Sequence, residues 1–203
     1  IFKKTKNKGH GFSNFYENKL KDIKEKKINI LEIGSFAGAS AAAFSKYFPN
    51  SKVFCFDINI SNFKYKSKNI HVFGIDINNE KKIKKTLDTI FLKHDIREFD
   101  IIIDDGSHNL SEILISLKFF FKFLKKKGYF IIEDFKHPNY YLYNKNIKHI
   151  LIDEFLKNLE NKKISPSSVF TENEQKDLAN NIEKIEYFKG NLKDSDISFI
   201  TKN

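Results

Sequence analysis

The sequence predicts an α/β fold: a doubly wound, mostly parallel sheet of seven strands that ends in a C-terminal antiparallel hairpin. Short apolar runs of strand length alternate five times with longer segments of helical periodicity, a pattern typical of a parallel sheet covered by helices. These runs are apolar at nearly every position, as strands buried on both faces are. A length of 203 residues fits one domain.

The first part of this alternation begins at Ile28 and ends near Phe135. Its expected strands are Ile28–Ile33, Lys52–Asp57, Ile70–Ile75, Phe99–Asp104 and Tyr129–Glu133. Its expected helices are Gly38–Phe48, Glu80–His94 and Leu110–Lys126. In the last of these, Lys125–Lys127 followed by Gly128 indicates a helix end with cations near the C-terminal dipole.

The remainder of the chain is less regular. Asn146–Leu159 can form a helix, and Asn161–Asn180 is polar enough to suggest a mobile loop. Lys184–Phe188 and Ile197–Thr201 resemble the two strands of a closing antiparallel hairpin. We therefore expect a single domain over 28–203, with 1–27 as an N-terminal appendage on the substrate side. Because the sequence contains no Met, we also expect that the true start is missing or processed.

The composition excludes several classes of protein. The net charge is +10, but Arg97 is the only arginine, and the lysines are spread through every segment. Since arginine is the usual fork for bidentate base and phosphate contacts, this pattern indicates a solvated surface more than a nucleic-acid interface. A single cysteine, Cys55, excludes a disulfide framework and a Cys-rich zinc site and fits a small core residue. No membrane span or signal sequence is visible, so we expect a cytoplasmic protein.

Acidic, polar or glycine residues lie at or just after the carboxyl end of each of the five parallel strands, where an open α/β sheet binds its ligands. They are Glu32, Gly34, Ser35, Gly38 and Ser40 at the first strand, Asp57 at the second, Asp76 at the third, Asp104, Asp105 and His108 at the fourth, and Glu133 and Asp134 at the fifth. Acidic residues on a surface without a function would not be expected at the ends of five consecutive strands.

The turn after the first strand has the character of a cofactor loop. Gly34 and Gly38 allow a sharp turn and a close approach of a ligand, and the helix that follows offers free N–H groups. The dinucleotide fingerprint requires a glycine where Phe36 stands. The alternative is a tight turn that binds nothing.

Two acids that follow the next two strands have the spacing of residues that bind a nucleotide-containing cofactor at such a loop. Asp57 has the spacing of a carboxylate that binds ribose hydroxyls, and Asp76 would then lie near an adenine. The alternatives are a turn cap at Asp57 and a turn before Asn78 at Asp76.

A second group of residues points to metal-assisted chemistry. Asp105 and His108 lie just past one strand, and Glu133 and Asp134 follow the next. Carboxylates that face each other repel unless a cation neutralises them, and oxygen ligands suit Mg²⁺, Ca²⁺ or Mn²⁺. His108 then lies within reach as a general base. The alternative is a solvated Asp-Asp-Gly turn.

With these motifs in place, the sequence resembles a known group of enzymes. The segments ILEIGSFAGAS, FCFDIN, FDIIIDDGSH and GYFIIEDF occur in this order. The spacing E-x-G-x-x-x-G-x-S within the first of them is similar to the first motif of the class I S-adenosylmethionine-dependent methyltransferases. Together the segments resemble the metal-dependent O-methyltransferases of the macrolide-sugar type, such as the mycinamicin and macrocin enzymes, and the cephalosporin-hydroxylase-like proteins. KGHGFSNFYE resembles a segment that often precedes this core, and the resemblance covers about residues 5–135 and the terminal hairpin.

The resemblance implies a Rossmann-like fold, S-adenosyl-L-methionine as cofactor and Mg²⁺ or another divalent cation. By position, Gly34, Ser35, Gly38 and Ser40 would line the methionine part of the cofactor, with Glu32 holding the loop. Asp57 would bind the ribose, Asp76 would border the adenine, and Asp104 would orient the cofactor or the neighbouring loop. The metal would be held by Asp105, Glu133 and Asp134, with Asp105 and His108 as the catalytic residues. His10, Tyr16 and His137 would line the substrate mouth.

These inferences predict a metal-assisted O-methyltransferase that acts on a hydroxyl of a sugar or of another small polyol-type natural product. A sugar-containing small molecule is the expected partner, without a membrane and without nucleic acid, and a homo-oligomer is left open. The chain is much shorter than the macrolide enzymes and lacks their large N-terminal portion. Two alternatives are kept: an RNA methyltransferase, suggested by the net charge, and a cofactor-binding subunit without catalysis.

Overall fold

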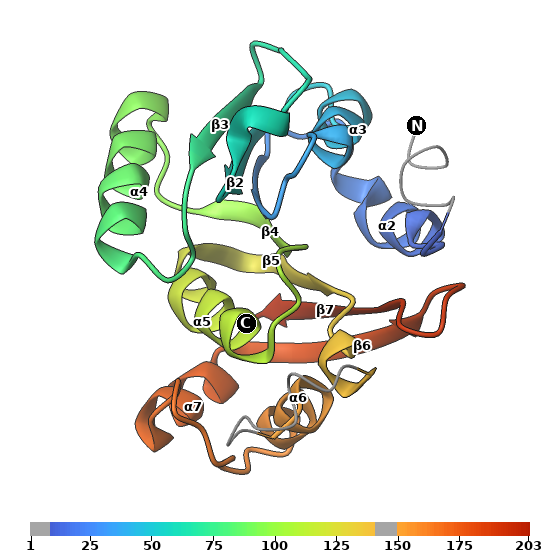
Figure 1. Ribbon diagram of the computed structural model, residues 1–203, viewed down its shortest axis with the longest axis vertical. Helices are drawn as coiled ribbons and strands as arrows, with labels where there is room; N and C mark the ends of the chain where they lie inside the picture. Colours follow the sequence, from blue (N-terminus) through green and yellow to red (C-terminus); the bar gives the residue numbers. More distant parts are fainter. Residues whose placement is uncertain (1–8, 141–149) are drawn as a thin grey trace.

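The computed structural model describes residues 9–140 and 150–203 and contains one sheet of seven strands in the order β3-β2-β1-β4-β5-β7-β6 (Figure 1). The strands are β1 (Asn29–Ile33), β2 (Lys52–Asp57), β3 (Ile70–Gly74), β4 (Phe99–Asp104), β5 (Leu124–Glu133), β6 (Ile182–Lys189) and β7 (Asp196–Lys202). β1 to β5 are parallel, while β7 runs antiparallel to both β5 and β6. The predicted fold class is therefore confirmed, including the antiparallel closing pair.

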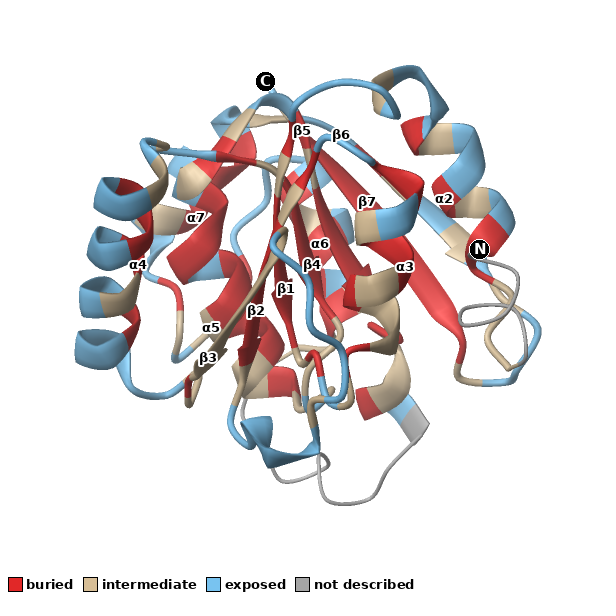
Figure 2. Cartoon of the chain, turned by 90° about the horizontal axis from the view of Figure 1, so that it is seen from above, coloured by how far each residue is buried: buried red, intermediate tan, exposed pale blue. Residues whose placement is uncertain are grey.

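Helices cover both faces of this sheet. The helices are α2 (Ser13–Leu20), α3 (Ala39–Tyr47), α4 (Glu80–His94), α5 (Leu110–Phe120), α6 (Ile152–Glu160) and α7 (Glu172–Asn180), and single 3₁₀ turns lie at Lys21–Ile23, Ile60–Asn62, Phe121–Phe123 and His137–Tyr140. Alternate residues of the central strands point to opposite faces, so Leu31 and Phe54 join a core under α4 to α7, and Ile30 and Val53 join a core under α2 and α3. Figure 2 shows the buried side of each helix turned toward the sheet.

One predicted helix boundary is wrong. The helix expected at Leu110–Lys126 ends at Phe120, and after a 3₁₀ turn the chain enters β5 at Leu124. Leu124 pairs with Phe99 of β4, and the Lys125 ammonium group lies 2.9 Å from the Asp100 carboxylate. The lysines at 125–127 therefore belong to the exposed start of a strand and do not end a helix.

The polar segment Asn161–Asn180 is also more ordered than predicted. It contains α7, which begins with a capping box: Thr171 Oγ1 accepts the N–H of Glu174, and Glu174 accepts the N–H of Thr171. Leu178 and Ala179 of this helix are buried against the sheet. Of the helix expected at Asn146–Leu159, residues 146–149 lie outside the described residues, and α6 extends from Ile152 to Glu160.

The N-terminal segment packs into the core. Phe12, Tyr16 and Leu20 are completely buried and join the hydrophobic core formed with α3 and β7. Cys55 is a buried free thiol in β2, as expected. Among the described residues, no helix is long and apolar enough to cross a membrane.

A histidine pair near the start of β2 predicts a pH-dependent stability. The rings of His71 and His94 lie 4.3 Å apart, and His71 also stacks on Phe54. Burial, followed by the charges of His94, Lys93 and Lys52, lowers the pKa of His71 to about 4. The unfolded chain thus binds a proton at His71 below about pH 6.5, whereas the folded chain binds it only below about pH 4. Stability is lost as the pH falls through this window.

Replacing His71 with phenylalanine should remove part of this loss. We expect the difference in melting temperature between pH 7 and pH 4.5 to be smaller in His71→Phe than in the wild type, because phenylalanine cannot take up the proton. Thermal unfolding followed by circular dichroism at the two pH values measures this difference in melting temperature. An equal difference in both proteins would contradict the assignment.

Candidate active site

The turns after β1 and β4 meet at the carboxyl edge of the sheet. Gly34 has φ +83°, and a Cβ added there would lie 2.2 Å from the carbonyl oxygen of Asp105. Gly38 has φ +79° and precedes α3, with the ring of Phe63 against its Cα. Glycine is therefore required at both positions by the backbone conformation and by the close approach of neighbours.

Asp57 ties the end of β2 to this glycine turn. Its Oδ2 accepts the N–H of Phe36 at 2.6 Å, and its Oδ1 accepts the N–H of Asn59 at 2.8 Å. The carboxylate therefore acts as the turn cap that we considered as the alternative, and its role as a ribose ligand stays a prediction.

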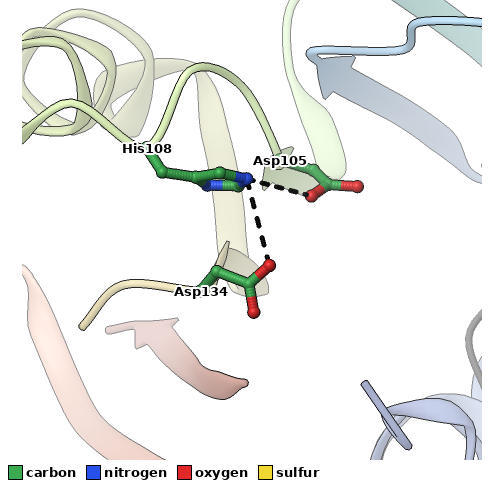
Figure 3. Close-up of side chains that lie close together, drawn as sticks. All are labelled: Asp105, His108 and Asp134. Carbon is green, nitrogen blue, oxygen red and sulfur yellow. Dashed lines mark ion pairs between the residues drawn. The ribbon is translucent and has the colours of Figure 1, made fainter. Parts of the chain in front are cut away.

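Two carboxylates and an imidazole converge beyond β4 and β5. His108 Nε2 lies 4.0 Å from Asp105 Oδ1 and 3.9 Å from Asp134 Oδ2 (Figure 3). One potential ligand atom from each of the three residues lies within 4.8 Å of the others. This set of two carboxylates and one imidazole suits a divalent cation, which would relieve the repulsion between the two acids.

The backbone at this site is held in sparsely populated conformations. Phe36, His108 and Asp134 have φ values of 41°, 57° and 51°, and they are three of the six non-glycine residues with positive φ in the described part of the chain. Such conformations cost about 1–3 kcal/mol each and tend to gather at functional sites. The strain therefore marks the same edge of the sheet as the side chains do.

Glu133, which we expected as a metal ligand with Asp105 and Asp134, is not one of the three clustered residues and has a different partner. Its Oε1 accepts a hydrogen bond from the Tyr16 phenol at 2.6 Å, and its side chain is almost completely buried. With Asp105 it lines a cavity of about 250 Å³. The other residues around that cavity are His10, Gly34, Ser35, Phe36, Ala37, Ala39 and Ser40.

The remaining candidates lie around this centre. Glu32 is completely buried in β1. Asp104 accepts the N–H of Gly106 at 3.2 Å, and burial raises its pKa to about 6, so it supports the turn that carries Asp105. Asp76 accepts the N–H of Asn78 at 2.9 Å, which is the local turn that we considered as its alternative.

The three residues expected at the substrate mouth are placed differently from one another. His10 is partly exposed, and its Nδ1 lies 3.0 Å from Asp134 Oδ1. The ring of His137 lies 5.3 Å from that of His108. Tyr16 is fully buried and does not line the cavity, although it donates to Glu133, which does.

One contact of the site has no signal in the sequence. Ser195, just before β7, places its Oγ 2.9 Å from His10 Nδ1, although 185 residues separate the two. Serine is frequent in turns, so nothing in its local sequence points to the site.

The strand order defines a Rossmann-like fold with an antiparallel closing pair, and solved structures of methyltransferases show the same fold. A MycE methyltransferase from the mycinamycin biosynthetic pathway, in complex with Mg, SAH and mycinamycin VI, superposes with a TM-score of 0.69 at 20% identity, covering 94% of this chain and 49% of that chain. A putative ribosomal RNA methyltransferase from Plasmodium falciparum has a TM-score of 0.59 at 15% identity, covering 94% and 93%. At these identities, the likeness shows the fold alone.

Sequence comparison with curated proteins gives relatives of higher identity. The chain is 30% identical over 135 residues to L-olivosyl-oleandolide 3-O-methyltransferase of Streptomyces antibioticus, covering 62% of this chain and 32% of the relative. It is 26% identical to mycinamicin VI 2''-O-methyltransferase of Micromonospora griseorubida, covering 62% and 31%. The chain thus spans about one third of the length of these relatives. No protein-family model matches the chain.

Proposed function

We propose that this chain carries the cofactor-binding and catalytic part of an S-adenosylmethionine-dependent O-methyltransferase, which transfers a methyl group to a sugar hydroxyl of a glycosylated small molecule. The observation that carries this proposal is the convergence of Asp105, His108 and Asp134 beside a glycine turn at one edge of the sheet. The two relatives named above, an L-olivosyl-oleandolide 3-O-methyltransferase and a mycinamicin VI 2''-O-methyltransferase, support the substrate class.

The cofactor would lie across the turn after β1. Gly34, Ser35 and Ser40 line the cavity there, and Asp57 is one hydrogen bond away through the N–H of Phe36. The carboxylate of Asp57 can accept the hydroxyl protons of a ribose, in place of the backbone donors that it now holds. When bound, S-adenosylmethionine supplies an activated sulfonium methyl group.

A divalent cation fits the carboxylates at the ends of β4 and β5. Asp105, Asp134 and Glu133 would hold it, and its charge would offset theirs and favour loss of a proton from a nearby hydroxyl. These ligands are held by the strained turn at Asp134 and by the buried position of Glu133.

His108 is placed to take the hydroxyl proton. S-adenosylmethionine would supply the methyl group to the hydroxyl oxygen and would leave as S-adenosylhomocysteine, and His108 Nε2 would accept the hydroxyl proton. This nitrogen lies about 4 Å from Asp105 Oδ1 and from Asp134 Oδ2, so a hydroxyl held at these carboxylates would be within reach of His108. Correct positioning of the hydroxyl supplies a further part of the rate.

Cofactor binding tests this proposal directly. In calorimetric titrations with and without Mg²⁺, the protein should bind S-adenosylmethionine and S-adenosylhomocysteine. Asp57→Ala should weaken binding of both by about 10- to 100-fold, because a hydrogen bond to a charged group contributes about 1.5–3 kcal/mol. Asp88→Ala, which removes an exposed aspartate from α4, should bind like the wild type.

If the wild-type protein bound neither S-adenosylmethionine nor S-adenosylhomocysteine, the proposed function would be overturned. Equal affinities of the Asp57 and Asp88 variants would overturn the assignment of the ribose ligand and leave the cofactor itself in place.

A further inference from the structure

Helix α2 is connected to the carboxyl edge of the sheet by a buried hydrogen bond. The phenol of Tyr16, in α2, donates to Glu133 Oε1 at 2.6 Å across a separation of 117 residues. Tyr16 is fully buried, and Glu133 is nearly so. A hydrogen bond to a carboxylate in such surroundings is strong, because water does not compete for either group.

The phenol ring of Tyr16 is fixed by its neighbours. It packs edge-on against Phe44 of α3, with ring centroids 5.5 Å apart, and against Phe199 of β7 at 5.7 Å. This packing keeps the hydroxyl directed at Glu133 Oε1.

This donor restricts the side chain of Glu133 at the end of β5. Glu133 is the last residue of β5, and its backbone is held opposite Ile197 of β7. The side-chain torsions still decide whether its carboxylate faces the cavity that it lines with Asp105. Because Tyr16 donates to Oε1, the position of this carboxylate oxygen is restrained before any ligand binds.

We propose that Tyr16 is a positioning residue for Glu133, which orients this carboxylate toward a divalent cation shared with Asp105 and Asp134. The proposal rests on the metal-assisted function proposed above. The N-terminal segment thereby takes part in the affinity of the metal site and does more than cover the sheet. Residues that hold a metal ligand from behind typically change metal affinity by about 10- to 100-fold when they are replaced.

The test is the affinity of the protein for Mn²⁺, followed by electron paramagnetic resonance of the free ion. Tyr16→Phe keeps the ring contacts with Phe44 and Phe199 and removes only the hydroxyl, so we expect about a 10-fold or greater loss of Mn²⁺ affinity. Tyr47→Phe is the matched control, since Tyr47 is the other buried tyrosine in the described chain, and it should bind Mn²⁺ like the wild type. Circular dichroism melts of the metal-free proteins report on folding separately.

A double-mutant cycle separates positioning from a general loss of packing. In a Glu133→Gln background, the further change Tyr16→Phe should have no additional effect on Mn²⁺ affinity, because the orientation of the carboxylate is the only route of action. This background also avoids a buried carboxylate without its donor, so it remains usable if Tyr16→Phe alone does not fold.

Two failures can be told apart. A wild-type protein that does not bind Mn²⁺ would overturn the metal-assisted function, and the role of Tyr16 with it. A wild-type protein that binds Mn²⁺ with the same affinity as Tyr16→Phe, or an equal loss of affinity in the Glu133→Gln background, would overturn only the positioning role.

Discussion

Replacement of His108 with asparagine should slow methyl transfer by about 10²- to 10⁴-fold, the usual contribution of a general base. Asparagine is the sharper choice than alanine, because residue 108 has φ +57° and asparagine tolerates the left-handed region better than other non-glycine residues. The amide cannot take up a proton near neutral pH. The rate can be followed as transfer of a labelled methyl group from S-adenosylmethionine to a methyl glycoside with adjacent hydroxyls.

The binding of Mn²⁺ to the same variant distinguishes the two roles that the geometry allows for His108. Its Nε2 is about equally distant from Asp105 and Asp134, so it could act as a base or as a metal ligand. A base predicts slow transfer with unchanged Mn²⁺ affinity and unchanged binding of S-adenosylhomocysteine. A ligand predicts weaker Mn²⁺ binding, and this result would contradict our mechanism.

A histidine at the opposite end of the strands provides the control for this experiment. His94 ends α4 near the start of β2, where its carbonyl accepts a hydrogen bond from Lys52. His94→Asn should leave methyl transfer close to the wild-type rate. Similar losses in the two variants would indicate damage to the fold and not loss of a base.

The gathering of acids at one edge could be predicted from the sequence because parallel strands share a carboxyl end. Each acid was placed by the end of its own strand, and the strand ends at Asp57, Asp104 and Glu133 agree with the structure. Neighbouring strands in a parallel sheet then bring Asp105 and Asp134 together without any knowledge of the loops.

The contacts behind these acids could not be predicted in the same way. Tyr16 and Ser195 reach the site from α2 and from the turn before β7, and no periodicity relates them to Glu133 or His10. From the sequence, Tyr16 is expected to line a substrate mouth. Packing between Phe44 and Phe199 instead decides its depth, and this depends on how the helix docks.

The errors in secondary structure have local causes. Lysines at 125–127 fit a helix end by charge, but pairing of Leu124 with Phe99 provides the strand ladder that decides the outcome. α7 was not predicted from the sequence, because its polar composition suggested a loop. The capping box at Thr171 and Glu174 was the signal for a helix start. A buried face of only a few residues was enough to hold this helix on the sheet.

Gly34→Ala is expected to have the largest effect on stability. Alanine at φ +83° costs about 1–2 kcal/mol, and a tightly packed extra methyl group typically costs a further 1–3 kcal/mol or so. Here the new Cβ would meet backbone atoms of Asp105 and Gly106 at 2.2 to 2.5 Å, and backbone cannot rotate aside as a side chain can. At about 2–4 °C per kcal/mol for a domain of this size, the melting temperature should fall by roughly 4 to 20 °C.

Gly74→Ala is the matched control, since its nearest neighbour is a side-chain atom of Ile60 at 3.9 Å and its backbone is ordinary strand. We expect little change in its melting temperature, and equal melting of the two variants would contradict the close approach at Gly34.

Relief of the clash in Gly34→Ala must move the turn after β4 away from the turn after β1. That movement displaces Asp105 from Asp134 and widens the cavity beside Ser35, so binding of Mn²⁺ and of S-adenosylhomocysteine should weaken together, even at temperatures where the variant is folded. Loss of one without the other would show that the two turns move independently.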